Sequence, residues 1–191
     1  GLGDVYKRQM LAHLGMSGQF RVSTQHAPQH RHTRIVITLD DGRDLRFLDQ
    51  RTFGGLTLAP LVDGIPGPVT HIAPDPFEEC FDVDEVVRRL CARRSAIKRS
   101  LLDQTLVSGI GNIYADETLW RVRCHPETPC SRLSQSEAVE LLQTACDVMA
   151  EAMSQGGTSF DSLYVNVNGE SGWFSRVLDA YGREDEPLPP M

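Results

Sequence analysis

A stretch rich in proline and glycine, residues 60–76, separates two parts of the chain with different hydrophobic patterns. Such a density of these residues ends regular structure and is typical of a linker. Before it, apolar residues alternate with a period of two, as in strands; after it, they recur every three or four residues, as in helices. We therefore expect an α+β chain with a β domain, a linker and an all-helical domain. The residues that mark the linker are Pro60, Gly64, Pro66, Gly67, Pro68, Pro74 and Pro76.

The first part predicts a β-hairpin. Residues 34–40 and 43–48 read as strands on either side of Asp41-Gly42. Asp-Gly supplies the positive φ angles of a tight two-residue turn. The side chains expected on one face are Ile35, Ile37, Leu39, Leu45 and Phe47.

The second part predicts four helices. Asp82 caps the first, Ser95 opens the second, and the third runs from about Gly111 to Arg121. Residues 134–137, Ser-Gln-Ser-Glu, form a capping box for the fourth, which a pair of glycines at 156–157 ends. The side chains expected to face inward are Val83, Val86, Val87, Leu90, Ile97, Leu101, Leu102, Ile113, Tyr114, Trp120, Leu141, Leu142, Ala145, Val148, Met149 and Ala152.

The charge is unevenly distributed. A net charge of −7 argues against nucleic-acid binding, because phosphates are bound by Lys and Arg. Residues 88–99, however, carry six cations and no acid, while acids gather at 75–85 and 179–186. An acidic body with one basic strip is compatible with DNA, but composition alone does not establish it.

The cysteines exclude two classes of protein. The five thiols are odd in number and irregularly spaced, and no Cys-x-x-Cys pair occurs, so we expect neither a disulfide scaffold nor a zinc site in these residues. No apolar run is long enough for a membrane span. We expect a cytoplasmic protein with reduced thiols.

The segment 103–112 has the composition of an anion-binding hairpin. Gly109 and Gly111 allow the backbone to approach a partner closely, and Asn112 begins the following helix. A helix start offers unpaired N–H groups to phosphate. From spacing alone, a helical hairpin in which Asn112 is only an N-cap is the more common structure.

The wider string carries a resemblance. Residues 107–117, Val-Ser-Gly-Ile-Gly-Asn-Ile-Tyr-Ala-Asp-Glu, closely resemble the helix-two-turns-helix signature of the formamidopyrimidine-DNA glycosylase family, with 96–98 and 125–126 in register. Residues 13–18 and 49–54 resemble two further signature turns of that family.

The resemblance extends from about Met10 to Pro187 and implies a domain plan. The expected segments are the end of an N-terminal antiparallel β-sandwich catalytic domain at 10–59, the linker at 60–76, a helix-two-turns-helix domain at 77–156, and a lesion-capping loop with the lead-in to a zinc hairpin at 157–191. Residues 1–9 match nothing that we recognise in the family, and a foreign or misread segment is one explanation.

The resemblance also implies roles for single residues. Three fill the void left when a damaged nucleotide is turned out of the duplex, since apolar wedges and arginine suit that space: Met16, Arg51 and Phe53. Phosphate contacts are expected from His13, Lys98, Asn112 and Tyr181, and a backbone clamp from Gly109 and Gly111. The lesion-capping loop includes Gly157, Thr158, Asn168 and Gly169. Thr52 replaces an arginine of many relatives, which weakens one expected phosphate contact.

The implied function is base-excision repair by a bifunctional DNA glycosylase and AP lyase that removes oxidised purines, such as 8-oxoguanine and formamidopyrimidines, from duplex DNA. The family's nucleophile is an N-terminal proline followed by glutamate, which we do not find matched here, so no catalytic residue is assigned. The family's structural zinc lies in a four-cysteine hairpin that is likewise unmatched, so no metal or other cofactor is expected in this chain. We expect an inactive fragment that acts as a monomer on damaged double-stranded DNA, with no membrane partner.

Two alternatives remain open. One is the endonuclease VIII branch of the same family, which acts on oxidised pyrimidines. The other is a non-catalytic nucleic-acid-binding protein that uses the helix-two-turns-helix alone. The acidic balance and the signature turns at 13–18 and 49–54 argue against the second.

Overall fold

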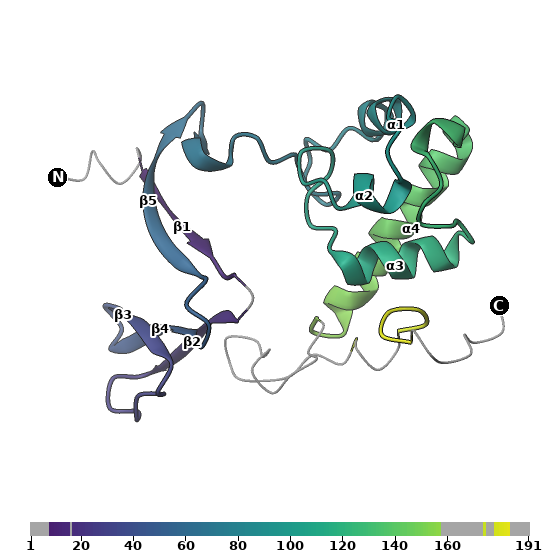
Figure 1. The fold of residues 1–191 in the computed structure, drawn as a ribbon. Coiled ribbons are helices and arrows are strands. Elements are labelled where there is room, and N and C mark those ends of the chain that lie inside the picture. The colour runs from purple at the N-terminus through teal and green to yellow at the C-terminus, as the bar shows by residue number, and fades with distance from the viewer. Residues whose placement is uncertain (1–7, 16, 158–173, 175–177, 184–191) are drawn as a thin grey trace. The chain divides into compact units, whose positions relative to one another are not determined.

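The computed structural model describes residues 8–15, 17–157, 174 and 178–183 (Figure 1). The chain divides into a strand unit, residues 1–70 and 155–175, and a helical unit, residues 71–154 and 176–191. Antiparallel strands precede helices, which confirms the α+β prediction. Within the described part, none of the helices combines the length and the apolar character that crossing a membrane requires.

The strand unit contains two antiparallel sheets. One has the order β1-β5-β6 and the other β2-β4-β3 (Figure 1). The strands are β1 (Arg8–His13), β2 (Gly18–Thr24), β3 (Thr33–Thr38), β4 (Arg43–Asp49), β5 (Gly55–Val62) and β6 (Ile65–Pro66), with a 3-10 turn, η2, at Gly67–Val69. The chain therefore crosses between the two sheets twice, once from β1 to β2 and once from β4 back to β5.

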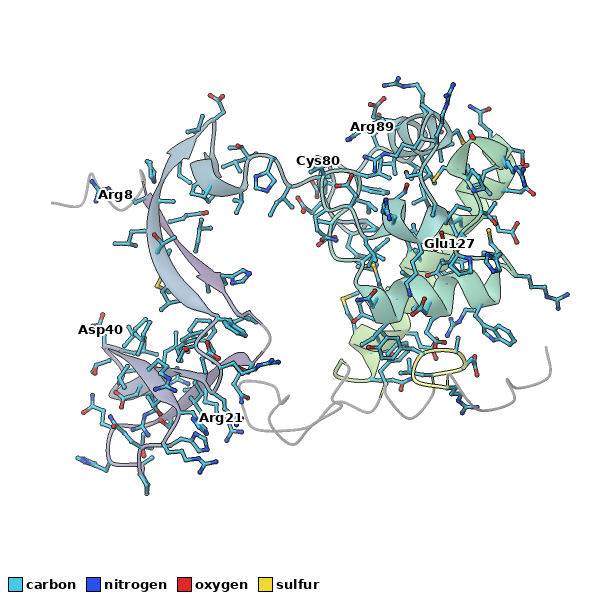
Figure 2. All side chains as sticks on the ribbon, in the orientation of Figure 1. Arg8, Arg21, Asp40, Cys80, Arg89 and Glu127 are labelled. Atoms are coloured by element: carbon cyan, nitrogen blue, oxygen red, sulfur yellow. The ribbon has the colours of Figure 1, made fainter. Side chains whose placement is uncertain are left out.

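The predicted hairpin is present as β3 and β4, but its turn has three residues instead of two. The amide of Leu39 donates to the Arg43 carbonyl at 2.8 Å, which leaves Asp40, Asp41 and Gly42 in the loop; Figure 2 labels Asp40 there. Gly42 has a φ of +82°, as the last residue of this turn requires. The two-residue prediction was wrong because Asp-Gly also suits a three-residue turn whose last residue has a positive φ.

Strand β4 lies at the centre of its sheet and is buried over most of its length. Phe47 packs its ring on Phe20 at a centroid distance of 5.2 Å, and Leu48 is also buried. Asp44 and Arg46 are buried as an ion pair with an N–O distance of 3.1 Å. The strand that leads into the second signature turn is thus fixed on both faces.

The helical unit is built around its longest helix, α4, which packs against α1 and α3 (Figure 1). The N-terminal caps of α1 and α4 are those predicted. Asp82 accepts from the amide of Glu85 at 3.0 Å at the start of α1, and Ser134 and Glu137 exchange the bonds of a capping box at the start of α4. The elements are α1 (Val83–Cys91), α2 (Ile97–Leu101), α3 (Asn112–Arg121), η3 (Cys130–Arg132) and α4 (Gln135–Ser154).

Two predictions of inward-facing side chains were wrong. Val83 is 41% exposed because it lies in the first turn of α1, ahead of the buried positions Val86, Val87 and Leu90. In α3 the buried positions are Ala115, Glu117, Thr118 and Leu119; Tyr114 is partly buried and packs against the core as predicted, whereas Ile113 and Trp120 are only partly covered. The hydrophobic pattern did not predict the buried face of α3, because a glutamate, Glu117, lies at the centre of that face. The second helix also begins at Ile97, two residues after the predicted Ser95.

Candidate functional site

The two signature turns of the strand unit lie side by side. Residues 14–17 join β1 to β2, and residues 50–54 join β4 to β5. His13 pairs with Gly55 at the end of one sheet, and Gly18 pairs with Asp49 at the start of the other. Both crossings therefore occur at the same place, and the two turns form one structure, called here the turn pair.

The turn pair is held by close backbone contacts. A Cβ atom on Gly18 would lie 2.3 Å from the Leu14 carbonyl oxygen and 2.8 Å from the Phe47 ring. Only glycine fits such an approach. The amide of Gly18 also donates to the Leu14 carbonyl at 2.7 Å, so the sequence of the first turn is dictated by its packing.

A single carboxylate binds both turns. Asp49 accepts from the Ser17 hydroxyl at 2.5 Å and the Arg51 amide at 3.1 Å through Oδ1, and from the Gly54 amide at 2.8 Å through Oδ2. The Ser17 hydroxyl bond, followed by that of the Gly54 amide, lowers the pKa of Asp49 below its usual range. Sequence reasoning gave this residue no role beyond membership of the 49–54 string.

The second turn presents the predicted void-filling side chains. Phe53 is 61% exposed, so most of its side chain is accessible to a partner. The guanidinium carbon of Arg51 lies 5.4 Å from the centroid of the Phe53 ring, within range of a cation–π contact. Thr52 between them has a φ of +56°. The structure thus brings Arg51 and Phe53 together, while Met16 falls outside the described residues.

Other parts of the chain contribute the remaining predicted contacts of the strand unit. His13 is exposed at the end of β1, next to the turn pair. Gly157, with a φ of +88°, accepts from the amide of Phe174 at 3.3 Å, so a backbone hydrogen bond joins these two residues on either side of the stretch predicted to cap the lesion. Thr158, Asn168 and Gly169 lie outside the described residues, and their roles stay predictions.

In the helical unit, the hairpin between α2 and α3 is held by two polar side chains. Asp103 accepts from the amide and hydroxyl of Thr105 at 3.0 and 2.8 Å. These bonds, together with Arg93 at 2.7 Å, lower its pKa to about 2. Gln104 accepts from the amide of Gly109 and donates to the carbonyl of Ile110, each at 3.0 Å. Gln104 therefore shapes the turn that leads into α3, a role that the sequence did not reveal.

The hairpin leads to an open helix start. Gly111 is the N-cap of α3, so Asn112 is its exposed first residue, and the N-cap interpretation of Asn112 was wrong. No side chain caps this helix among the described residues. A Cβ atom on Gly111 would meet nothing within 4 Å, whereas one on Gly109, where φ is +84°, would meet Met149 at 2.8 Å. Gly109 thus serves internal packing, and Gly111 keeps the approach to the helix start open.

The basic strip, residues 88–99, is partly neutralised. Lys98 pairs with Asp116 of α3 at 2.6 Å, so this predicted phosphate ligand already has an anionic partner. Arg88 pairs with Glu85, and Arg89, labelled in Figure 2, donates to the Thr105 carbonyl at 2.8 Å. The basic strip therefore stabilises the hairpin between α2 and α3 and also carries positive charge.

Glu117 is the most unusual acid of the helical unit. It is fully buried in α3 and accepts the amides of Asp179, Ala180 and Tyr181 at 2.9 to 3.0 Å. The same helix thus begins at Asn112 and fixes the backbone of Tyr181, another phosphate ligand predicted for this unit. Glu117 ends the 107–117 string, but no local signal showed that its partners are more than sixty residues away.

The cysteines do not fit the structural zinc that the family implies. All five are free thiols, from exposed Cys80 (Figure 2) to buried Cys130. Within the described ranges, no group of three or more His, Cys, Asp or Glu side chains could hold a metal.

Comparisons with known proteins agree with this geometry. Family models described as the formamidopyrimidine-DNA glycosylase H2TH domain and N-terminal domain match residues 72–163 and 2–56. The MutM (Fpg) protein of Thermus thermophilus is 36% identical, with a TM-score of 0.83 over 96% of this chain and 67% of that one. The chain belongs to the formamidopyrimidine-DNA glycosylase family. The resemblance inferred from the signature strings is confirmed.

Two further members of the formamidopyrimidine-DNA glycosylase family show how much of it the chain represents. The enzyme of Rhodococcus jostii (strain RHA1) is 55% identical over 184 residues, which cover 94% of this chain and 63% of that relative. The Lactococcus lactis Fpg, crystallised with DNA containing an abasic site, is 31% identical, with a TM-score of 0.84 over 95% of this chain and 66% of that one. The chain thus spans slightly less than two thirds of these relatives.

Proposed function

We propose that the chain contributes to base-excision repair as part of a DNA glycosylase and AP lyase that acts on oxidised purines in duplex DNA. The residues described here supply damage recognition and DNA docking in that reaction. The observation that carries the proposal is the exposed Phe53 beside Arg51 on a turn fixed by a buried carboxylate. An apolar ring held outside the protein is suited to wedge into a stack that has lost a base.

Docking on the DNA backbone falls to the helical unit. The uncapped start of α3, with Asn112 exposed and Gly111 open, offers N–H groups and one amide side chain to a phosphate. Tyr181 and Lys98 are proposed as further phosphate ligands; for Lys98, binding exchanges Asp116 for phosphate. In the strand unit, His13 is proposed to contact the backbone near the turn pair.

Chemistry of the family requires an extruded base, and the void left behind must be filled. We assign that part to Arg51, Phe53 and, from the resemblance, Met16. The Lactococcus lactis relative, whose structure holds abasic-site DNA, is the basis for choosing an abasic analogue as the probe. Gly157, Thr158, Asn168 and Gly169 are proposed to cover the everted purine.

The test is the ratio of affinities for a duplex with a stable abasic-site analogue and for the same intact duplex, at one salt concentration. We expect the chain to prefer the abasic duplex. Phe53→Ala should lower only this preference, and Asn112→Ala should weaken binding to both duplexes. A folded chain with no preference, or a preference that Phe53→Ala leaves unchanged, contradicts the proposal.

The endonuclease VIII alternative predicts a different lesion. Comparing duplexes with 8-oxoguanine and thymine glycol distinguishes the branches, and we expect tighter binding to 8-oxoguanine. The reverse order would assign the chain to the oxidised-pyrimidine branch.

A further inference from the structure

We propose that Asp49 is a positioning residue for damage recognition, which fixes the turns at 14–17 and 50–54 to one another so that they enter damaged DNA as one piece. The inference rests on the proposed function. It assigns a role to a residue that touches no DNA, because its exposed fraction is 1%.

The contacts of Asp49 divide between the two turns. Ser17 of the first turn donates its hydroxyl to Oδ1, and the same hydroxyl accepts from the Arg51 amide at 3.0 Å. Gly54 of the second turn donates to Oδ2. The carboxylate and the Ser17 hydroxyl thus close a ring of hydrogen bonds around the base of the segment that carries Phe53.

The backbone of Asp49 is fixed as well. It pairs with Gly18 in the β2–β4 ladder, and its carbonyl oxygen accepts from Nε of Arg34 at 2.8 Å. Because the backbone of Asp49 is fixed in the sheet, its carboxylate holds the two turns in place instead of moving with them. This geometry makes Asp49 an anchor for Phe53, which itself is mostly exposed.

Anchoring matters because an exposed wedge on a loose turn must be ordered when it enters the duplex. That ordering opposes binding by the conformational entropy of the turn. Insertion of Phe53 requires an ordered turn, and Phe53 inserts only at a void. A turn that is already ordered therefore lowers the entropic cost of binding only for a duplex with a void. Asp49 should therefore raise the preference for a duplex with a void and leave general docking unchanged.

Asp49→Asn tests this with little change of shape. Asparagine has one acceptor oxygen and an NH2 donor, and the NH2 must face either the Gly54 amide or the Ser17 and Arg51 donors. One orientation loses the Gly54 bond; in the other, the Ser17 hydroxyl can rotate to accept from the NH2, and the bond from the Arg51 amide to Oδ1 is lost. Ser17→Ala is a milder second variant that removes only the hydroxyl bridge.

The matched control is Asp44→Asn. Asp44 is also a buried aspartate of β4, bound to Arg46 and to the Thr38 hydroxyl, and it makes no hydrogen bond to the described residues of either turn. It should lower the melting temperature of the chain while leaving the preference for abasic DNA intact.

The experiment uses the 191-residue chain with the abasic-analogue duplex and the intact duplex, and 2-aminopurine beside the void reports insertion of the wedge. We expect Asp49→Asn to reduce the abasic preference by about tenfold, with intact-duplex affinity unchanged and a weaker 2-aminopurine signal. Ser17→Ala should show the same pattern to a smaller extent. If Asp49→Asn fails to fold, Ser17→Ala carries the test.

The outcomes separate this inference from the function on which it rests. If Phe53→Ala abolishes the preference but neither Asp49→Asn nor Ser17→Ala changes it, the inference is wrong and the function stands. If Asp49→Asn lowers both affinities in proportion to its melting temperature, as a structural defect would, the inference is also wrong. If Phe53→Ala has no effect, the proposed function itself fails.

Discussion

The strand unit and the helical unit offer their candidate DNA contacts in opposite ways. In the strand unit, side chains project from a turn whose own backbone is held by Asp49 and Ser17. In the helical unit, the backbone at the start of α3 lacks a side-chain cap among the described residues, and nearby side chains such as Gln104 are occupied in holding it. A void in a base stack calls for an apolar side chain, whereas a phosphate calls for N–H groups. Each unit thus presents the chemical group that its proposed target requires.

The largest effect is expected from Glu117→Ala, which probes internal support in the helical unit. It leaves three amides of residues 179–181 without an acceptor. We expect a loss of about 3–5 kcal/mol in the unfolding free energy of this unit, measured by urea denaturation followed through helical circular dichroism. Glu140→Ala, an exposed glutamate on α4, should change it by less than about 0.5 kcal/mol. Equal losses for the two variants would show that Glu117 does not support residues 179–181.

A pair of glycine variants contrasts the two units directly. Gly18→Ala forces a Cβ atom against the Leu14 carbonyl and the Phe47 ring, so it should destabilise the free protein by about 1–3 kcal/mol. Gly111→Ala meets nothing within 4 Å and should leave stability almost unchanged. It should instead weaken binding to intact duplex DNA several-fold, because the added methyl group narrows the approach to α3.

Thermal unfolding of both variants, and their titration with intact duplex, measure this contrast. A stable Gly18→Ala protein would remove the argument that packing dictates the turn pair. A Gly111→Ala protein with wild-type affinity would mean that the open space at the start of α3 is not used by DNA.

The smallest effect is expected from acid, which acts on both units through Asp49 and Asp103. The pKa of Asp103 falls from 3.8 to about 2, so its ionised form stabilises the fold fully above pH 3.8. That stabilisation is lost as the pH falls toward 2. The lowered pKa of Asp49 acts in the same direction. Melting temperatures between about pH 5 and pH 2 should therefore decline less steeply for Asp103→Asn than for the unaltered chain. If melting temperature falls with pH equally steeply for Asp103→Asn and for the unaltered chain, the assignment of this acid effect to Asp103 is contradicted.

Rules that act over a few residues predicted the parts of the fold that depend on them. The Asp82 cap and the Ser134–Glu137 capping box are set within three residues, and both were found as predicted. The β3–β4 hairpin was also predicted, except for its turn length. Residue strings identified the family, and the structure then placed Arg51 beside Phe53 and Asn112 at the start of α3.

The supporting residues could not be predicted in the same way. Asp49 binds Ser17 across thirty-two positions and Glu117 binds Asp179 across sixty-two, so each role depends on tertiary structure. Polarity misled the interpretation as well, because a glutamate at the centre of a buried helix face contradicts the rule that charges lie outside.

Helix α3 has a further consequence for how the protein responds to its surroundings. Its first turn faces a candidate ligand, and its middle grips residues 179–181 through Glu117. A helix of ten residues is about 15 Å long and does not bend easily over that length. The proposed phosphate ligand Asn112 and the backbone of residues 179–181 are therefore both attached to one short helix. A spectroscopic label near Asn112 should therefore respond to changes at residues 179–181.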